Sequence, residues 1–192
     1  MTRIVSALVV AFAVSVSSLP AQADDRSICF NTNDANWNEA SRFDGAIAAC
    51  TRLTKAWEGQ RRADAYTSRG SWYTRKKDFK KALADFDQAL DLDPTNVEIY
   101  DYRGDALMAS GDLDSAIANY DQAIRIDPTY AAAHYSRGRA YEQKGDLDTA
   151  KHGYRAALVP PEKRKLEMQV RIQRWAQNSA RKRLQELDAS GK

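Results

Sequence analysis

The chain has 192 residues with 29 Lys or Arg against 26 Asp or Glu, which leaves a net charge of only +3. The length fits a single domain. Beyond the first residues no apolar run is long enough to cross a bilayer, which excludes a polytopic membrane protein. The charge is uneven along the chain, because residues 24–160 carry a net −3 and residues 161–192 a net +5.

Residues 1–23 have the features of a secretory signal peptide. Arg3 supplies a positive start, Ile4 to Val16 form an apolar run too short for a transmembrane helix, and Ala21-Gln22-Ala23 is a typical cleavage site. We therefore predict cleavage after Ala23 and a periplasmic or secreted protein, for which nucleic acid is not an expected partner. A buried N-terminal helix is the alternative interpretation.

Residues 24–62 are predicted to form an N-terminal cap that contains both cysteines. An irregular lead-in over 24–37, rich in Asn and Asp, precedes a helical pattern from Asn38 to about Trp57. In an oxidising compartment Cys29 and Cys50 are expected to form a disulfide, although two buried free thiols remain the alternative. The helical pattern is like the second helix of the later units, so the first helix of this unit is expected to be missing or degenerate, with the disulfide tying the lead-in into its place.

From residue 63 the sequence repeats itself with a period of 34 residues, which is typical of a helix–turn–helix array. The predicted units are 63–96, 97–130 and 131–164. We interpret the recurring residues as packing residues, with each glycine allowing a close helix approach, an alanine facing it, and an aromatic ring filling the space to the next unit. These residues are Gly70, Gly104 and Gly138; Ala82, Ala116 and Ala150; Phe86, Tyr120 and Tyr154.

The turn inside each unit has its own signature. Gly111-Asp112 and Gly145-Asp146 combine a residue that ends a helix in the left-handed conformation with one that caps the next helix. Lys77-Asp78 breaks the glycine pattern, so the first turn is expected to cost more or to differ in shape. Pro94 and Pro128 end the second helices of the first two units.

Residues 165–192 are predicted to form most of a basic C-terminal capping helix that starts near Glu162. Its apolar face is expected to cover the end of the stack and includes Leu166, Val170, Trp175, Leu184 and Leu187. Its other face carries Lys163, Arg164, Lys165, Arg171, Arg174, Arg181, Lys182 and Arg183. That face is either simply solvated or an electrostatic patch for an acidic partner or an anionic membrane surface.

The three units resemble tetratricopeptide repeats (TPRs). The first unit carries the large, small and aromatic residues of the family's first helix, and the alanines, aromatic residue and closing proline of its second: Tyr66, Gly70, Tyr73, Ala82, Phe86, Ala89 and Pro94. The resemblance implies an all-α TPR superhelix of about three helix–turn–helix repeats, whose first helices line a concave groove. With its signal peptide and cysteine-containing cap, the chain is similar to small exported bacterial TPR proteins.

The resemblance also implies which first-helix positions point into the groove. From these we predict as partner-binding residues Asp64, Thr67, Ser71, Glu98, Asp101, Asp105, Met108, Tyr135, Arg139 and Glu142. The middle of this set is acidic, so a neutral or basic segment is expected, with Tyr135 and Met108 adding contact area. The Lys and Asn residues with which one branch of the family holds chaperone C-termini are absent. A generic polar face without a ligand is the alternative.

The sequence offers no catalytic or metal-binding arrangement. His134 and His152 lack the neighbouring Cys, Asp or Glu of a metal site or a catalytic triad, and no cofactor is expected. We therefore predict a non-catalytic TPR adaptor or scaffold of the bacterial envelope that binds a peptide or protein segment in its groove. The alternative is a structural or assembly subunit that docks through the basic C-terminal helix to an acidic partner or a membrane surface.

Overall fold

The computed structural model describes the backbone of residues 19–30, 39–158 and 167–191, which forms nine helices and no strand over these ranges. In chain order the helices are α1 (Leu19–Phe30), α2 (Glu39–Ala56), α3 (Gly59–Arg75), α4 (Phe79–Leu92), α5 (Val97–Ser110), α6 (Leu113–Ile126), α7 (Ala131–Gln143), α8 (Leu147–Ala157) and α9 (Glu167–Ala189). The predicted all-α class is confirmed. None of the described helices combines the length and the apolar character needed to cross a membrane.

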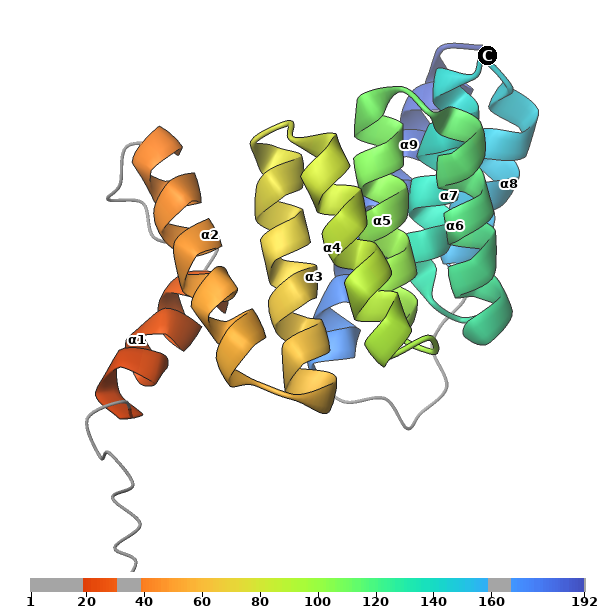
Figure 1. The fold of residues 1–192 in the computed structure, drawn as a ribbon. Coiled ribbons are helices and arrows are strands. Elements are labelled where there is room, and N and C mark those ends of the chain that lie inside the picture. The colour runs from red at the N-terminus through yellow and green to blue at the C-terminus, as the bar shows by residue number, and fades with distance from the viewer. Residues whose placement is uncertain (1–18, 31–38, 159–166, 192) are drawn as a thin grey trace, which may run out of the picture.

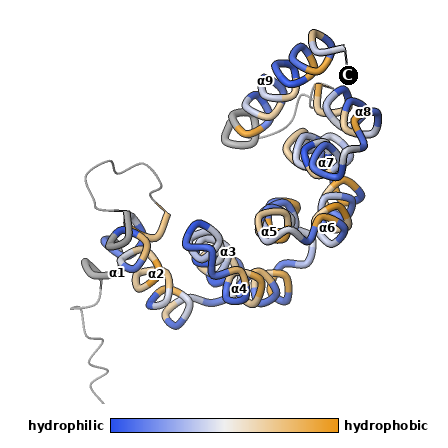
Figure 2. Tube along the Cα trace, turned by 90° about the horizontal axis from the view of Figure 1, so that it is seen from above, coloured by the Kyte–Doolittle hydropathy of each residue, from blue (hydrophilic) through white to orange (hydrophobic). Residues whose placement is uncertain are grey.

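Consecutive helices pack as antiparallel pairs, and the pairs are arranged in an arc (Figure 1). Seen from above, α3, α5 and α7 lie along the inner side of the arc, while α4, α6 and α8 form its outer side (Figure 2). Each inner helix also contacts the inner helix of the next pair. The three predicted repeats therefore correspond to α3–α4, α5–α6 and α7–α8, and α3 begins a few residues before the predicted start.

The turn inside each repeat follows the predicted chemistry. Asp78, Asp112 and Asp146 cap the second helices by accepting a hydrogen bond from the backbone N–H three residues further on. Before them, Gly111 and Gly145 have φ of 92° and 84°. Lys77, with φ of 61°, adopts the same left-handed conformation. The first turn therefore has the common shape, although a lysine occupies the glycine position.

Each repeated glycine lies under the aromatic ring of its own repeat. A Cβ added at Gly104 would be 2.5 Å from Tyr120 Cε1, and one added at Gly70 would be 2.9 Å from Phe86 Cε1. The predicted alanine does face the glycine, since the added Cβ would be 3.2 Å from the Ala82 carbonyl oxygen at Gly70 and 3.1 Å from that of Ala150 at Gly138. The prediction that the ring fills the space to the next unit is wrong, because the ring lies over the glycine of its own repeat. The ring needs more room than alanine, and only a residue without a Cβ leaves it that room.

The N-terminal cap differs from its prediction. Residues 24–30 belong to helix α1, whereas the sequence predicted an irregular lead-in, and residues 31–38 lie outside the described part. The predicted disulfide between Cys29 and Cys50 is present, with 5.0 Å between the Cα atoms. Trp72 Nε1 donates a hydrogen bond of 2.8 Å to the Cys29 carbonyl oxygen. Helix α1 thus packs on α2 and contacts α3 as a first helix would, so of the two alternatives, a missing or a degenerate first helix, the missing one is wrong.

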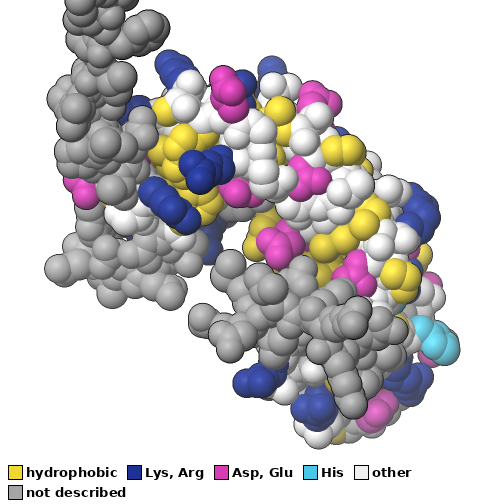
Figure 3. Space-filling view, turned by 90° about the horizontal axis from the view of Figure 1, so that it is seen from below, with side chains coloured by type: hydrophobic (Ala, Val, Ile, Leu, Met, Phe, Trp, Pro, Cys, Tyr) yellow, Lys and Arg dark blue, Asp and Glu magenta, His cyan; other side chains and the backbone are white. Residues whose placement is uncertain are grey.

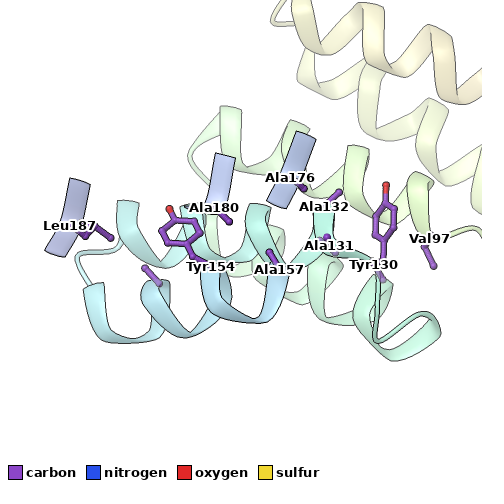
Figure 4. Close-up of a cluster of buried hydrophobic side chains, with 12 residues drawn as sticks. Val97, Tyr130, Ala131, Ala132, Tyr154, Ala157, Ala176, Ala180 and Leu187 are labelled. Carbon is purple, nitrogen blue, oxygen red and sulfur yellow. The ribbon is translucent and has the colours of Figure 1, made fainter. Parts of the chain in front are cut away.

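Helix α9 packs against α7 and α8 and closes the C-terminal end of the arc. Ala176, Ala180 and Leu187 are buried in a cluster with side chains of α7 and α8 (Figure 4). Trp175, predicted on this packed face, is instead 57% exposed, because one residue along a helix turns the side chain by about 100°. The predicted helix start at Glu162 and the side chains of Leu166 and Val170 lie outside the described residues.

Candidate partner-binding groove

The inner face of the arc holds a groove of about 980 Å³ between α1, α3 and α5. Its lining comes mainly from α1, α3 and α5, with Trp57 of the α2–α3 connection and Ile172 of α9 at its edges. Figure 3 shows hydrophobic side chains at this hollow face with basic and acidic side chains around them. The volume lies in the range of known ligand sites, so the groove has room for several side chains of a partner.

Helix α3 contributes the predicted residues of the first repeat. Asp64, Thr67 and Ser71 line the groove together, as does Thr74 one turn further along the same face. The hydroxyls of Thr67 and Ser71 donate to carbonyl oxygens of their own helix, at 2.8 and 3.0 Å. Small side chains with internally satisfied hydroxyls leave this part of the groove open and polar. These predicted residues are brought together.

Helix α5 divides the predicted residues of the second repeat between groove and interior. Glu98 and Asp105 line the groove. Asp101, only 5% exposed, and Met108 are buried and do not line it. Asp101 lies close to Ser136 and Arg139 of α7, and one of its carboxylate oxygens has no hydrogen-bond partner among the described residues. The repeat register predicted the correct face of α5, but it could not predict that packing against α7 buries Asp101.

The carboxylates of α5 experience a strongly unfavourable environment. Burial raises the pKa of Glu98, and the nearby Asp64 raises it further. Burial also raises the pKa of Asp105, although Tyr120 donates a hydrogen bond of 2.9 Å to it. Burial together with Glu98 and Asp101 raises the pKa of Tyr102 to about 12. This side of the groove therefore repels anions and would be stabilised by a cation.

The predicted residues of the third repeat make contacts within the chain instead. Glu142 accepts hydrogen bonds from Arg183 of α9 and, at 2.6 Å, from the Tyr154 hydroxyl. Tyr135 packs edge-on against Trp175 of α9, with ring centroids 5.4 Å apart, and Arg139 lies over the Tyr135 ring. These three residues do not line the groove. Helix α9 occupies the inner side of the third repeat, which the repeat register alone could not predict.

Sequence reasoning missed the N-terminal end of the groove. Here Phe30 of α1 stacks on Trp57 with ring centroids 6.1 Å apart, and Phe30 is 40% exposed. Arg26, one turn before Phe30, and Arg61, four residues after Trp57, also line the groove, whereas Arg75 lines it from the far end of α3. The missed signal was the apolar pair Ile28 and Phe30 on either side of Cys29, which was taken for part of an irregular segment.

Neither of the two histidines lines the groove. His134 is buried with a ring nitrogen 2.8 Å from the Pro128 carbonyl oxygen, and burial lowers its pKa. His152 is exposed. Within the described ranges no three His, Cys, Asp or Glu side chains cluster in a way that could hold a metal ion.

One of the described basic residues of α9 makes an ion pair within the chain, and three others are exposed. Arg174, Arg181 and Lys182 are exposed, whereas Arg183 is bound to Glu142. The side chains of the remaining basic residues, Lys163, Arg164, Lys165 and Arg171, lie outside the described part. Three exposed cations of this helix are therefore available for a partner.

Two stretches of the sequence match family models: residues 63–96 match the tetratricopeptide repeat model, and residues 104–145 match a model described as TPR repeat. Similar solved structures include MamA, at 22% identity with 79% of this chain and 81% of that chain covered and a TM-score of 0.53. The Sgt2 TPR domain from Aspergillus fumigatus is 22% identical, with 68% of this chain and 83% of that chain covered and a TM-score of 0.52. The first TPR of Spaghetti (RPAP3), bound to an HSP90 peptide, is 23% identical, with 67% of this chain and 95% of that chain covered and a TM-score of 0.52. At such identities the likeness shows the fold alone. No curated protein matches the chain.

Proposed function

Because residues 63–96 and 104–145 of this chain are TPR repeats, we propose that the protein is a non-catalytic adaptor or scaffold that binds a peptide or protein segment in the groove between α1, α3 and α5. The observation that carries this proposal is the groove itself, which stays open at the first two repeats while α9 covers the third. TPR repeats generally serve as protein-binding modules rather than as catalysts.

The chemistry of the groove supports a segment rather than a small metabolite. Its lining combines aromatic, hydroxyl and charged side chains, mainly from α1, α3 and α5. A groove of this kind suits an elongated ligand that offers side chains to several helices. The RPAP3 repeat with its HSP90 peptide demonstrates that a stack of this fold can hold a peptide.

We also propose that the protein works outside the cytoplasm, in the periplasm or beyond it. The predicted signal peptide and the disulfide between Cys29 and Cys50 support this location. Detection of the mature N-terminus at Asp24 in an envelope fraction would support export, and an uncleaved cytoplasmic chain would contradict it.

The groove is tested by filling it. Ser71→Trp places a large ring among the lining residues, whereas Ala118→Trp places the same ring on the exposed surface of α6. Peptides selected from a displayed random library by the oxidised full chain should bind the Ser71 variant at least about tenfold more weakly, equivalent to ~1.4 kcal/mol. Equal affinity for both variants and the parent would contradict a binding role for the groove.

A second candidate function is docking through α9. The observation that favours it is the exposed Trp175 beside Arg174 on the same helix, with Arg181 and Lys182 also exposed. Charge reversal at Arg174, Arg181 and Lys182 should abolish binding to anionic vesicles or acidic proteins if α9 is the docking surface. Arg183 is left unchanged in this variant because it holds Glu142.

A further inference from the structure

We propose that the N-terminal end of the groove is a separate subsite, which accepts an acidic side chain next to an apolar one and thereby fixes the direction of the bound segment. The subsite consists of Arg26 and Phe30 of α1, Trp57, and Arg61 of α3. The inference rests on the proposed function and adds the chemistry of the ligand to it.

The first step is the state of the arginines. Arg26 and Arg61 line one cavity, both are exposed, and neither has an ion pair with a carboxylate among the described residues. Other arginines of the described part are held by carboxylates, as Arg69 is by Asp85 at 2.6 Å and Arg137 by Asp121 at 2.7 Å. Two exposed guanidinium groups that line one groove, with no carboxylate partner among the described residues, favour an anionic group, which they can bind through charge-assisted hydrogen bonds.

The second step is the apolar surface between these arginines. Phe30 is 40% exposed although it lies in a concave site, and it stacks on Trp57. The main chain at Trp57 is held in place, because Arg62 Nε donates to its carbonyl oxygen. Rigid aromatic rings beside cations favour an apolar side chain adjacent to the acidic one.

The third step is the contrast with the other side of the groove. Glu98 and Asp105 of α5 line that side together with Asp64 of α3, and no ion pair neutralises them among the described residues. A carboxylate of the ligand is repelled there and attracted at the α1 end. A segment with its acidic residue at one end can therefore bind in only one direction.

The experiment is selection from a random peptide library with a fixed C-terminal linker, using the oxidised full chain as bait. Peptides that depend on the groove are defined as those that bind the parent and the Ala118→Trp variant but not the Ser71→Trp variant. Among these we expect enrichment of Asp or Glu directly beside Leu, Ile, Phe or Trp. A synthetic copy of the most enriched peptide should bind Arg26→Gln and Arg61→Gln about tenfold more weakly each, the size of one charge-assisted hydrogen bond.

Arg155→Gln is the matched control, because Arg155 is exposed on α8 and does not line the groove. It should leave the affinity unchanged. Groove-dependent peptides without acidic enrichment, or full affinity in both arginine variants, would overturn the subsite and leave the proposed function standing. If no selected peptide depends on the groove, the proposed function fails, and the subsite with it.

Discussion

At the scale of single residues, the contact between the repeated glycine and the ring above it determines how closely the helices of a pair approach. In the second repeat a Cβ at position 104 would meet three atoms of the Tyr120 ring, at 2.5 to 2.9 Å. Tyr120 cannot move aside easily, because it is fully buried and its hydroxyl donates to Asp105. The glycine is therefore required for packing rather than for backbone flexibility.

We expect Gly104→Ala to lower the free energy of unfolding by about 1–3 kcal/mol, the usual cost of overpacking a core. Urea denaturation followed by circular dichroism measures the change. Gly70→Ala is the graded comparison, since its nearest contact is longer at 2.9 Å and its loss should be smaller. A Gly104 variant as stable as the parent would show that the second repeat has room to spare.

Lys77, the left-handed residue of the first turn, is a position where a change to glycine should stabilise the protein. Lys77 has φ of 61°, a conformation that costs a residue with a Cβ about 1–2 kcal/mol. Lys77→Gly removes this cost, and the greater freedom of glycine in the unfolded chain offsets part of the gain, so a net stabilisation of about 0.5–1 kcal/mol is expected. Gly111→Lys should destabilise by a similar amount. No change in thermal or urea stability for either variant would contradict this account.

Asp101 should make stability depend on pH. Its carboxyl is buried near Glu98 and Asp105, and burial raises its pKa well above the usual value. A group whose pKa is higher in the folded than in the unfolded chain destabilises the fold above that folded pKa, and the penalty disappears as pH falls toward about 4. Asp101→Asn should therefore stabilise the protein at pH 7, on the order of 1–3 kcal/mol, and by progressively less as the pH is lowered.

Urea titrations at several pH values measure this difference. The control is Asp91→Asn, which alters an exposed carboxylate of α4 and should have little effect at any pH. A stabilisation by Asp101→Asn that stays constant from neutral to acidic pH would contradict the assignment of a buried charge.

The repeat period predicted residue roles well wherever local geometry decides them. It gave the capping aspartates and the turn glycines, because a turn depends on neighbours in the sequence. It could not distinguish Glu98, which is half-buried and lines the groove, from the buried Asp101 on the same helix, since burial depends on how α7 packs against α5. The period also predicted Glu142 as a groove residue. In the structure Glu142 does not line the groove and instead binds Arg183, forty-one positions further along the chain.

At the scale of helices, α1 depends on tertiary contacts rather than on its own sequence. Its N-terminal part lacks an apolar periodicity, and Asp25 is held by Arg52 of α2 at 2.8 Å. The disulfide and the Trp72 hydrogen bond to Cys29 join it to α2 and α3. Sequence periodicity could not predict such a helix, because isolated short helices are unstable in water and this one forms only against its neighbours.

We expect the double variant Cys29→Ala/Cys50→Ala to lose about 3 kcal/mol of stability, the chain-entropy value for a loop of this length. Amide hydrogen exchange in α1 should accelerate strongly, while α5 to α8 stay protected. Arg52→Gln leaves the buried carboxylate of Asp25 without its ion-pair partner and should cost about 1–3 kcal/mol. Unchanged protection of α1 in the double variant would mean that the disulfide does not hold this helix.

At the scale of the whole molecule, one arginine in each repeat connects neighbouring helix pairs. Arg103 of α5 donates to Asp87 of α4, in the preceding repeat, at 3.0 Å and to Asn119 of α6, in its own repeat, at 3.1 Å. Arg69 likewise reaches back to Thr51 of α2, and Arg137 to Asp121 of α6. The recurring Arg-Gly pair of the sequence is thus explained by two different contacts. The glycine packs against the ring of its own repeat, and the arginine joins its repeat to the preceding helix pair.

The stability of a repeat array is approximately the sum of its units and the interfaces between them, so loss of one interface should reduce cooperativity more than it reduces stability. We expect Arg103→Met, which keeps the apolar stem, to cost about 1–2 kcal/mol and to uncouple the α1–α4 part from the rest. Of the four tryptophans, only Trp175 lies beyond this part. Tryptophan fluorescence should therefore change at lower urea than far-UV circular dichroism in this variant, whereas Arg155→Met keeps the two transitions together. Coincident transitions at the parent's midpoint in the Arg103 variant would show that the apolar contacts alone hold the repeats together.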